Sequence, residues 1–289
     1  MPTYAVTGAT GPFGRHAVDT LLARGVPAGD VVAVVRTPAK AADLAERGVQ
    51  VREGDYDRPE TLAGAFAGVT HLLFVSASEV GRRVPQHTAI VEAARAAGVG
   101  RIAYTSILKA GATSNPLAPE HEATEAALAE SGVPHSLLRN GWYLENYTGQ
   151  VGRYVATGEV VGAAGDGRVA AALRSEYAEA AVAALLSDEG ARVVHELGGP
   201  SFSFPELASA VADAAGTPVV YRDLPVDELA GVLSGAGLPE PVAQMFAAVD
   251  GAIAAGDLDT TPDELARLIG RAPAALADVV AAAVASSQA

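Results

Sequence analysis

The sequence contains no cysteine among its 289 residues. This absence excludes disulfide bonds, cysteine nucleophiles, thiolate zinc sites and iron–sulfur clusters. It is also typical of a reducing compartment. Residues 1–8 carry no basic targeting region and lead directly into a strand pattern, so we expect a cytoplasmic protein.

Positive charge is scarce: 20 lysine and arginine residues oppose 34 aspartate and glutamate residues, which gives a net charge of −14. Such a negative field repels nucleic-acid phosphates, and we therefore expect no nucleic-acid partner. An anionic ligand binds to such a chain only where a local positive potential overrides the overall field. Lys40 and Lys109 are the only lysines, so any mechanism that requires a lysine is confined to two positions.

Long hydrophobic runs are also missing. The longest uncharged stretch lies between Glu60 and Glu79, and glycine and histidine residues interrupt it. A membrane-spanning helix needs about 20 consecutive, mostly apolar residues. We therefore expect neither a membrane span nor a membrane partner.

Short apolar segments alternate with longer helical patterns in the first half of the chain. The expected strands are 4–6, 31–35, 49–52, 72–75, 102–105 and 136–138. They are rich in valine, isoleucine and leucine, as strands buried on both faces of a parallel sheet are. The alternation predicts an α/β fold, a Rossmann-like doubly wound parallel sheet with right-handed crossovers.

Strands become sparse after about residue 146, where 169–172, 194–197 and 219–221 are the candidates. Helices dominate, and two of them begin with the pattern of a capping box, at 203–206 and 261–264. The sequence thus predicts a Rossmann domain over 1–150 and a smaller, mostly helical C-terminal lobe over 151–289. Part of segment 175–197 lies within the C-terminal lobe by sequence, but it is able to pack back on the sheet of the Rossmann domain.

A glycine-rich turn, TGATGPFG at residues 7–14, follows the first expected strand and opens the first helix. Gly8 permits the tight turn, Gly11 lets the backbone approach a pyrophosphate, and Gly14 lets the helix pack closely on the sheet. The anion then lies at the helix N-terminus, where N–H groups and the helix dipole attract it. The spacing between Gly8 and Gly11 is one residue longer than that between the first two glycines of the usual dinucleotide fingerprint. The alternative interpretation of this segment is an ordinary glycine turn.

Arg36 directly follows the second expected strand. At this place an arginine accommodates the 2′-phosphate of NADP, whereas an acid bonds the ribose 2′-hydroxyl of NAD. No acidic residue lies beside Arg36 in the sequence, and the alternative is a solvated surface arginine. Asp55 follows the third strand, where it either lies near the adenine or begins a helix.

Further residues follow the later strands. Ser76 and Ala77 follow the fourth strand, Ser106 follows the fifth, and Asn140 and Trp142 follow the sixth. The carboxyl ends of parallel strands face one crevice, and ligands bind where the strand order reverses. We therefore expect these segments to converge on one ligand.

Five segments, spread over more than half of the chain, carry a resemblance to a known family. They are TGATGPFG, VSASEVGRRVPQH, GVGRIAYTS, SLLRNGWYLENY and GAAGDG. Together they resemble the NmrA-like group of atypical short-chain dehydrogenases, and within it the type 2 NAD(P)H:quinone oxidoreductases. The resemblance implies direct hydride transfer from NADPH to a quinone, without flavin. It also implies a cofactor site formed by Gly8, Thr10, Gly11, Pro12, Phe13, Arg36, Ser76, Ala77 and Asn140, with Trp142 and Tyr143 beside the nicotinamide.

The chain departs from the pattern of this group at two places. Pro12 and Phe13 replace a polar residue followed by leucine, and this change lies in the pyrophosphate loop. Lys109 stands where the subgroup tends to have histidine, which leaves the role of that position open.

The Tyr-x-x-x-Lys pair of most short-chain dehydrogenases is missing. Neither lysine has a tyrosine four residues before it, because those positions hold Arg36 and Thr105. Reduction of a simple ketone, which needs a positioned proton donor, is therefore disfavoured. A quinone suits such a site, because water can protonate the stabilised hydroquinone anion and the protein supplies proximity and a dry slot.

Some residues are candidates for catalysis or substrate binding. His121 is the best candidate for a general acid, because it lies on the helix after the fifth strand; the alternative is an exposed surface histidine. Ser106 is a second catalytic candidate, able to bond a carbonyl, or else a plain strand-end serine. Trp142, Tyr143 and Tyr147 are candidates to stack on a quinone ring, with structural packing under a loop as the alternative.

The histidines show no metal-ligand spacing, so we expect no metal. The sequence therefore predicts an oxidoreductase with NADPH as cofactor and a small-molecule quinone as substrate, and a homodimer is the candidate assembly. The alternative is a non-catalytic binding protein that senses the balance of NADPH and NADP, a role that also occurs in the NmrA-like group.

Overall fold

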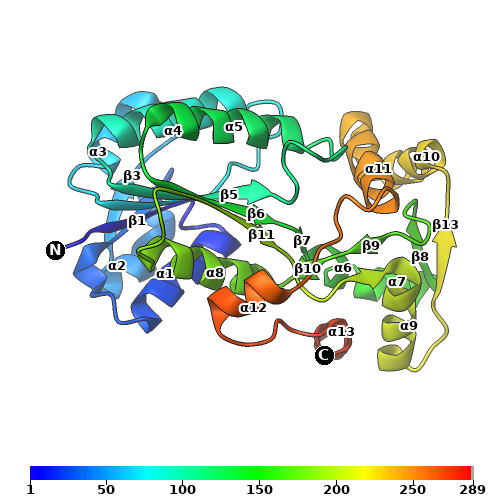
Figure 1. Ribbon diagram of the computed structural model, residues 1–289. Coiled ribbons are helices and arrows are strands. Elements are labelled where there is room, and N and C mark those ends of the chain that lie inside the picture. The colour runs from blue at the N-terminus through cyan, green and yellow to red at the C-terminus, as the bar shows by residue number, and fades with distance from the viewer. Residues whose placement is uncertain (288–289) are drawn as a thin grey trace. The chain divides into compact units, whose positions relative to one another are not determined.

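A computed structural model describes residues 1–287 and divides the chain into two compact units (Figure 1). Within the described residues, unit 1 comprises 1–110, 119–140 and 174–195, and unit 2 comprises 111–118, 141–173 and 196–287. The sequence analysis drew one boundary after residue 150, whereas the structure groups 141–150 with unit 2 and 174–195 with unit 1. The chain thus passes between the units several times.

Unit 1 is built on a seven-stranded sheet with the strand order β11-β6-β5-β4-β1-β2-β3. Its strands are β1 (Tyr4–Thr7), β2 (Val31–Val35), β3 (Gln50–Glu53), β4 (His71–Phe74), β5 (Arg101–Ile107), β6 (His135–Asn140) and β11 (Arg192–Leu197). Neighbouring strands from β3 through β6 pair in parallel. This strand order and parallel pairing confirm the predicted Rossmann-like sheet, and its central strands β2 and β5 are almost entirely buried.

Helices cover both faces of the sheet in unit 1. The elements are η1 (Ala28–Asp30), η2 (Pro38–Ala41), η3 (Pro59–Thr61), α1 (Pro12–Ala23), α2 (Ala42–Glu46), α3 (Leu62–Ala65), α4 (Arg83–Ala96), α5 (Ala118–Ser131) and α8 (Arg174–Leu186). Helices α1, α2 and α8 lie on one face, and α3, α4 and α5 lie on the other (Figure 1). Segment 174–186 does pack back on the sheet, as α8, where it contacts β4, β5 and β6.

The strand order reverses between β1 and β4. From β1 the chain moves outward to β2 and β3, and then returns to β4 on the other side of β1. The loops after these two strands therefore begin at the same edge of the sheet, where ligands bind in open α/β folds. They are the glycine-rich turn and the segment that starts at Val75.

Unit 2 combines short strands with helices around its own core. Its elements are β7 (Trp142–Tyr143), β8 (Glu159–Gly162), β9 (Arg168–Val169), β10 (Ala171–Ala172), β12 (Phe202–Ser203), β13 (Val220–Asp223), α6 (Glu145–Thr148), α7 (Val151–Thr157), α9 (Phe204–Ala215), α10 (Val226–Gly235), α11 (Glu240–Ala254), α12 (Asp263–Ile269) and α13 (Leu276–Ser287). Aromatic and aliphatic side chains from β9, β12, α7, α9 and α13 form the core. Along residues 1–287, no helix is long and apolar enough to cross a membrane.

The two expected capping boxes have different outcomes. Ser203 and Glu206 form the predicted box, since each side chain accepts a bond from the other residue's backbone N–H. The box expected at 261–264 is wrong: helix α12 begins at Asp263 after Pro262, without a side-chain cap. The sequence pattern is present there, but Thr261 does not occupy the N-cap position.

Candidate nucleotide-binding site

The predicted cofactor residues lie in unit 1, and the predicted aromatic substrate residues lie in unit 2. Those in unit 1 are Gly8, Thr10, Gly11, Pro12, Phe13, Gly14, Arg36, Asp55, Ser76, Ala77 and Asn140, together with the catalytic candidates Ser106 and His121. Trp142, Tyr143 and Tyr147 belong to unit 2. Each group is therefore described within its own unit.

The glycine-rich turn has the geometry of a phosphate-binding loop. Gly8 has a φ of +60°, which favours glycine, and the Gly11 N–H donates to its carbonyl at 2.9 Å. A Cβ on Gly14 would lie 2.4 Å from the same carbonyl oxygen, so only glycine fits this close approach. Helix α1 starts at Pro12, and no side chain caps its first turn. The loop thus leaves the helix N-terminus open to an anion.

Side chains from three different elements hold the loop that follows β4. Thr7, Thr105 and His87 accept the N–H groups of residues 75, 76 and 77 at 2.9, 2.8 and 3.0 Å. Three successive amides are therefore fixed beside the glycine-rich turn. Because its Nε2 accepts, neutral His87 carries its proton on Nδ1, which lies 2.8 Å from Thr124 Oγ1. The sequence analysis did not identify His87, although it lies in a segment that carries the resemblance.

Arg36 follows β2, as predicted, and its guanidinium contacts an acidic residue that is distant in the sequence. Arg36 Nη1 lies 3.0 Å from Glu79 Oε1, and 65% of the arginine side chain is exposed. Glu79 comes from the loop after β4, so sequence adjacency to Arg36 could not reveal it. The cation at the end of β2 is therefore accessible but already paired.

Asp55 stabilises the turn after β3. Its Oδ1 accepts the Asp57 N–H at 3.1 Å and its Oδ2 accepts from Arg58 Nε at 3.2 Å. Its own N–H donates to Thr61 Oγ1 at 2.9 Å. Asp55 thus lies in a turn ahead of η3 and does not begin the helix that the alternative in the sequence analysis expected; a contact of Asp55 with adenine stays a prediction.

Asn140 provides an unsatisfied polar group at the end of β6. Its side chain is 4% exposed, and neither Oδ1 nor Nδ2 has a hydrogen-bond partner within residues 1–287. Buried side-chain amides are normally bonded, and an orphaned one calls for an explanation. A ligand that supplies both a donor and an acceptor would satisfy both atoms, and cofactor binding by Asn140 stays a prediction.

His121 lies in a buried polar network, so the alternative of an exposed surface histidine is wrong. Its Nδ1 lies 2.7 Å from Tyr104 Oη and its Nε2 lies 3.4 Å from Arg83 Nη1. Because a guanidinium can only donate, Nε2 accepts and Nδ1 carries the proton. Burial, and next the positive charge of Arg83, lowers the pKa of His121 to about 3. The imidazole is therefore neutral at neutral pH, and its role as an acid stays a prediction.

Ser106 is engaged within unit 1. Its hydroxyl donates to Glu125 Oε1 at 2.6 Å. The same carboxylate accepts from Arg139 Nε at 3.0 Å and from Arg139 Nη2 at 2.6 Å. The hydroxyl proton is thus committed to a partly buried ion pair, which favours the strand-end alternative; a catalytic role for Ser106 stays a prediction.

The buried histidines predict an acid-sensitive fold. His87 and His121 each have a pKa lowered from 6.5 to about 3, chiefly by burial. Between these values the unfolded chain binds protons that the native chain does not, so stability is present above pH 6.5 and is lost as the pH falls. Each histidine contributes a slope of about 1.4 kcal/mol per pH unit in this window.

Urea unfolding of the wild type and His87→Gln between pH 5 and 7 tests this. We expect a shallower pH slope for His87→Gln, by about 1 kcal/mol per pH unit averaged over this range and by up to about 1.4 kcal/mol per pH unit near pH 5, whatever its stability at pH 7. Burial raises the pKa of Asp250 to about 6, which gives a slope of opposite sign in both proteins and cancels in the comparison. Equal slopes would mean that His87 is protonated in the native state.

The aromatic candidates in unit 2 have different environments. Trp142 and Tyr143 form β7 and are partly exposed. Tyr147 is 7% exposed and makes edge-to-face contacts with Phe202 and Phe204, each at 5.5 Å between ring centroids. Tyr147 is therefore a core residue, as the packing alternative proposed, whereas quinone stacking on Trp142 and Tyr143 stays a prediction.

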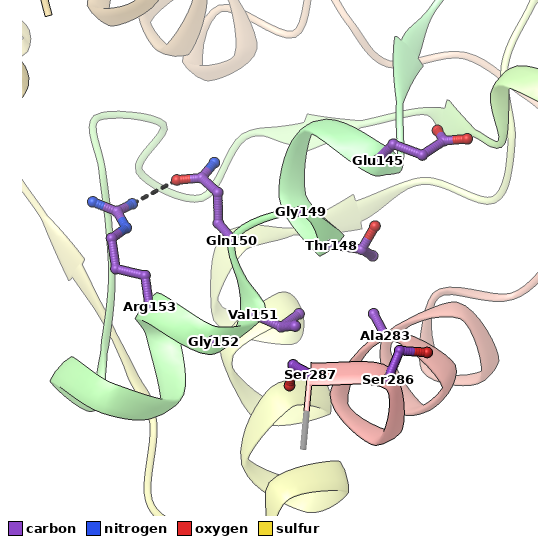
Figure 2. A pocket seen from close by; sticks show the side chains of 10 residues that line it. All are labelled: Glu145, Thr148, Gly149, Gln150, Val151, Gly152, Arg153, Ala283, Ser286 and Ser287. Carbon is purple, nitrogen blue, oxygen red and sulfur yellow. Dashed lines mark hydrogen bonds between the residues drawn. The ribbon is translucent and has the colours of Figure 1, made fainter. Parts of the chain in front are cut away.

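Unit 2 also contains an open pocket of about 700 Å³ between α6, α7 and α13 (Figure 2). Glu145, Thr148, Gln150, Arg153 and Ser286 are among its lining residues. Arg153 Nη2 donates to Gln150 Oε1 at 2.7 Å on one side of the pocket (Figure 2). None of the predicted site residues lines this pocket.

Comparisons with known proteins identify the family and several relatives of this chain. Residues 8–189 match the NAD(P)H-binding family. The chain is 43% identical to quinone oxidoreductase 2 of Escherichia coli K12 over 96% of both chains. It is 31% identical to the NmrA-like family domain-containing oxidoreductase flvB of Aspergillus flavus, over 96% of this chain and 93% of that one.

A solved structure resembles the whole chain. The crystal structure of the Escherichia coli NADPH-dependent quinone oxidoreductase complexed with NADPH has a TM-score of 0.94 and 41% sequence identity. The similarity covers 97% of this chain and 99% of that chain. The resemblance predicted from five sequence segments is thereby confirmed. This protein belongs to the NAD(P)H-binding family, and within it to the NmrA-like group.

Proposed function

We propose that this protein is an NADPH-dependent oxidoreductase that transfers a hydride directly to a quinone, without flavin or metal. The observation that carries the proposal is the accessible guanidinium of Arg36 at the end of β2. It lies at the carboxyl-terminal edge of the parallel sheet, where the glycine-rich turn also begins. The NADPH complex of a relative similar over nearly the full chain supports it.

The residues of unit 1 fit a dinucleotide. The glycine-rich turn leaves the first turn of helix α1 without a side-chain cap, so the N–H groups at this helix N-terminus are available to a pyrophosphate. Asn140 offers a buried donor and acceptor that lack partners along residues 1–287. We assign the pyrophosphate to the glycine-rich turn, the 2′-phosphate to Arg36, and the nicotinamide end to Asn140, Ser76 and Ala77.

NADPH, when bound, supplies a hydride, and the quinone that accepts it takes one proton from water. The protein holds the loop after β4 rigidly through Thr7, Thr105 and His87, which positions the ligand with little reorganisation. His121, with a pKa of about 3, is neutral and delivers no imidazolium proton near pH 7. We expect Trp142 and Tyr143 to bind the quinone.

Turnover tests the proposal. Purified protein, NADPH and a soluble naphthoquinone are mixed, and the loss of nicotinamide absorbance is followed with and without added flavin. We expect NADPH oxidation well above the protein-free rate, stoichiometric with quinone reduction and independent of added flavin. Tight binding of NADPH without turnover across several quinones would instead support the redox-sensor alternative, which is not favoured because both named relatives are oxidoreductases.

His121→Ala tests the role of the buried imidazole. If hydride transfer depends mainly on proximity, kcat falls by less than about 100-fold, a range that covers lost positioning of the network. The measurement is steady-state kinetics with NADPH and quinone, accompanied by thermal unfolding. Complete loss of activity in a variant that unfolds at the same temperature as the wild type would contradict this expectation. It would show that the reaction requires general-acid catalysis by His121.

The cellular location and the assembly of the protein are open to direct measurement. We expect a cytoplasmic location, which cell fractionation tests. We also expect a homodimer, for which sedimentation velocity gives a direct answer.

A further inference from the structure

Arg36 belongs to a charged cluster formed by Glu79, Arg82, Asp57 and Gln86, which we name the Glu79 cluster. Glu79 Oε1 pairs with Arg36 Nη1 at 3.0 Å, while Glu79 Oε2 accepts from Arg82 Nη1 and Gln86 Nε2, both at 3.2 Å. Asp57 Oδ1 accepts from Arg82 Nη2 at 2.8 Å and from Gln86 Nε2 at 2.9 Å. The two oxygens of Glu79 thus have different partners.

Because its two oxygens have different partners, Glu79 stays anchored when Arg36 turns to another partner. Loss of the Arg36 contact leaves Oε2 bonded to Arg82 and to the buried Gln86, both of which Asp57 holds in turn. The carboxylate therefore has no reason to move away. Two arginines and two carboxylates also give this cluster no net formal charge, so a phosphate arrives at a neutral group of side chains.

We propose that Glu79 is a specificity-determining residue: it is the internal counter-ion that the 2′-phosphate of NADPH must displace from Arg36. The proposal rests on the proposed function, because it requires the 2′-phosphate to bind at Arg36. NADPH must break the ion pair and then lie close to a retained carboxylate. NADH has no 2′-phosphate and leaves the pair intact. Glu79 therefore reduces the preference for NADPH over NADH.

Glu79→Gln tests this, with affinity for NADPH and NADH measured by calorimetry at constant ionic strength. Glutamine keeps the size of the side chain and removes its charge. We expect NADPH to bind about three- to tenfold more tightly. The variant has no exposed ion pair for the 2′-phosphate to break and no carboxylate to repel it. NADH affinity is expected to change by less than about twofold, because no phosphate meets the altered residue.

Glu264→Gln is the matched control. Glu264 is also a carboxylate paired with an arginine, Arg267, and its replacement changes the net charge equally. It lies in unit 2, so it reports only the general effect of charge. We expect both affinities to remain at wild-type values in this variant. An equal gain in NADPH affinity would assign the effect to overall charge and overturn the proposal.

A double-mutant cycle shows whether Glu79 acts through Arg36. In an Arg36→Gln background, Glu79→Gln is expected to have a clearly smaller effect on NADPH affinity than in the wild type. If Glu79→Gln folds poorly, Glu79→Asp withdraws the carboxylate from Arg36 and is expected to shift the preference in the same direction, by less. Unchanged or weaker NADPH binding in a folded variant would overturn the inference. Absence of NADPH binding to the wild type would instead contradict the proposed function itself.

Discussion

Arg36→Glu is expected to weaken NADPH binding by about 100-fold, while NADH binding changes by less than about threefold. The substitution removes a charge-assisted contact with the 2′-phosphate. It also places a carboxylate at the end of β2, where Glu79 already supplies one. Two like charges then face a phosphate that carries the same sign. Calorimetry with both nucleotides gives the two affinities directly.

Two controls separate the causes of this loss. Arg36→Gln removes the guanidinium without adding a negative charge, so we expect a loss of about tenfold for NADPH. Arg47→Glu makes the same change of charge at an arginine that pairs with Asp19, and we expect no change in cofactor preference. Equal losses of NADPH and NADH affinity in Arg36→Glu would show that Arg36 does not discriminate between them.

Gly14→Ala is expected to damage both the fold and cofactor binding. The added Cβ would lie 2.4 Å from the Gly8 carbonyl oxygen and 2.7 Å from the Ala9 Cα, and backbone atoms cannot give way as a flexible side chain can. We expect a loss of about 3 kcal/mol in the free energy of unfolding, the upper range for overpacking. The displaced loop should also weaken NADPH binding by more than about tenfold.

Gly64→Ala is the matched control for this substitution. Gly64 lies in helix α3, and a Cβ there has no heavy atom within 4 Å. Because alanine favours helix by up to about 1 kcal/mol over glycine, we expect unchanged or slightly higher stability. Urea unfolding gives the free energies and calorimetry gives the affinities. Wild-type stability of Gly14→Ala would mean that helix α1 can shift on the sheet.

The central strands of unit 1, β1, β2, β4 and β5, were predictable because burial on both faces imposes a simple pattern. Strand β2 has the predicted bounds, since five consecutive apolar residues form a strand buried along its whole length. The glycine-rich turn was predictable for a related reason: its geometry depends on missing side chains, which the sequence displays directly. By contrast, β8 and β13 pair with each other as short segments that contain exposed or charged residues, and β8 was missed.

The errors at the site concern burial and pairing between distant segments. His121 has a glutamate on either side, which suggested exposure, yet Glu120 Oε1 accepts the N–H groups of Gly81 and Arg83 near the start of α4. The neighbouring imidazole of His121 is buried against Tyr104 and Arg83. Glu79 meets Arg36 because β4 and β2 flank β1, a relation set by strand order and not by local sequence.

Calorimetric titration of the folded wild-type protein with NADPH and with NADH, at two temperatures, tests the central claim most directly. The account predicts saturable binding at one site per chain, with NADPH bound more tightly than NADH despite the net charge of −14. Absence of NADPH binding, by heat at either temperature and by protection against thermal unfolding, would contradict it.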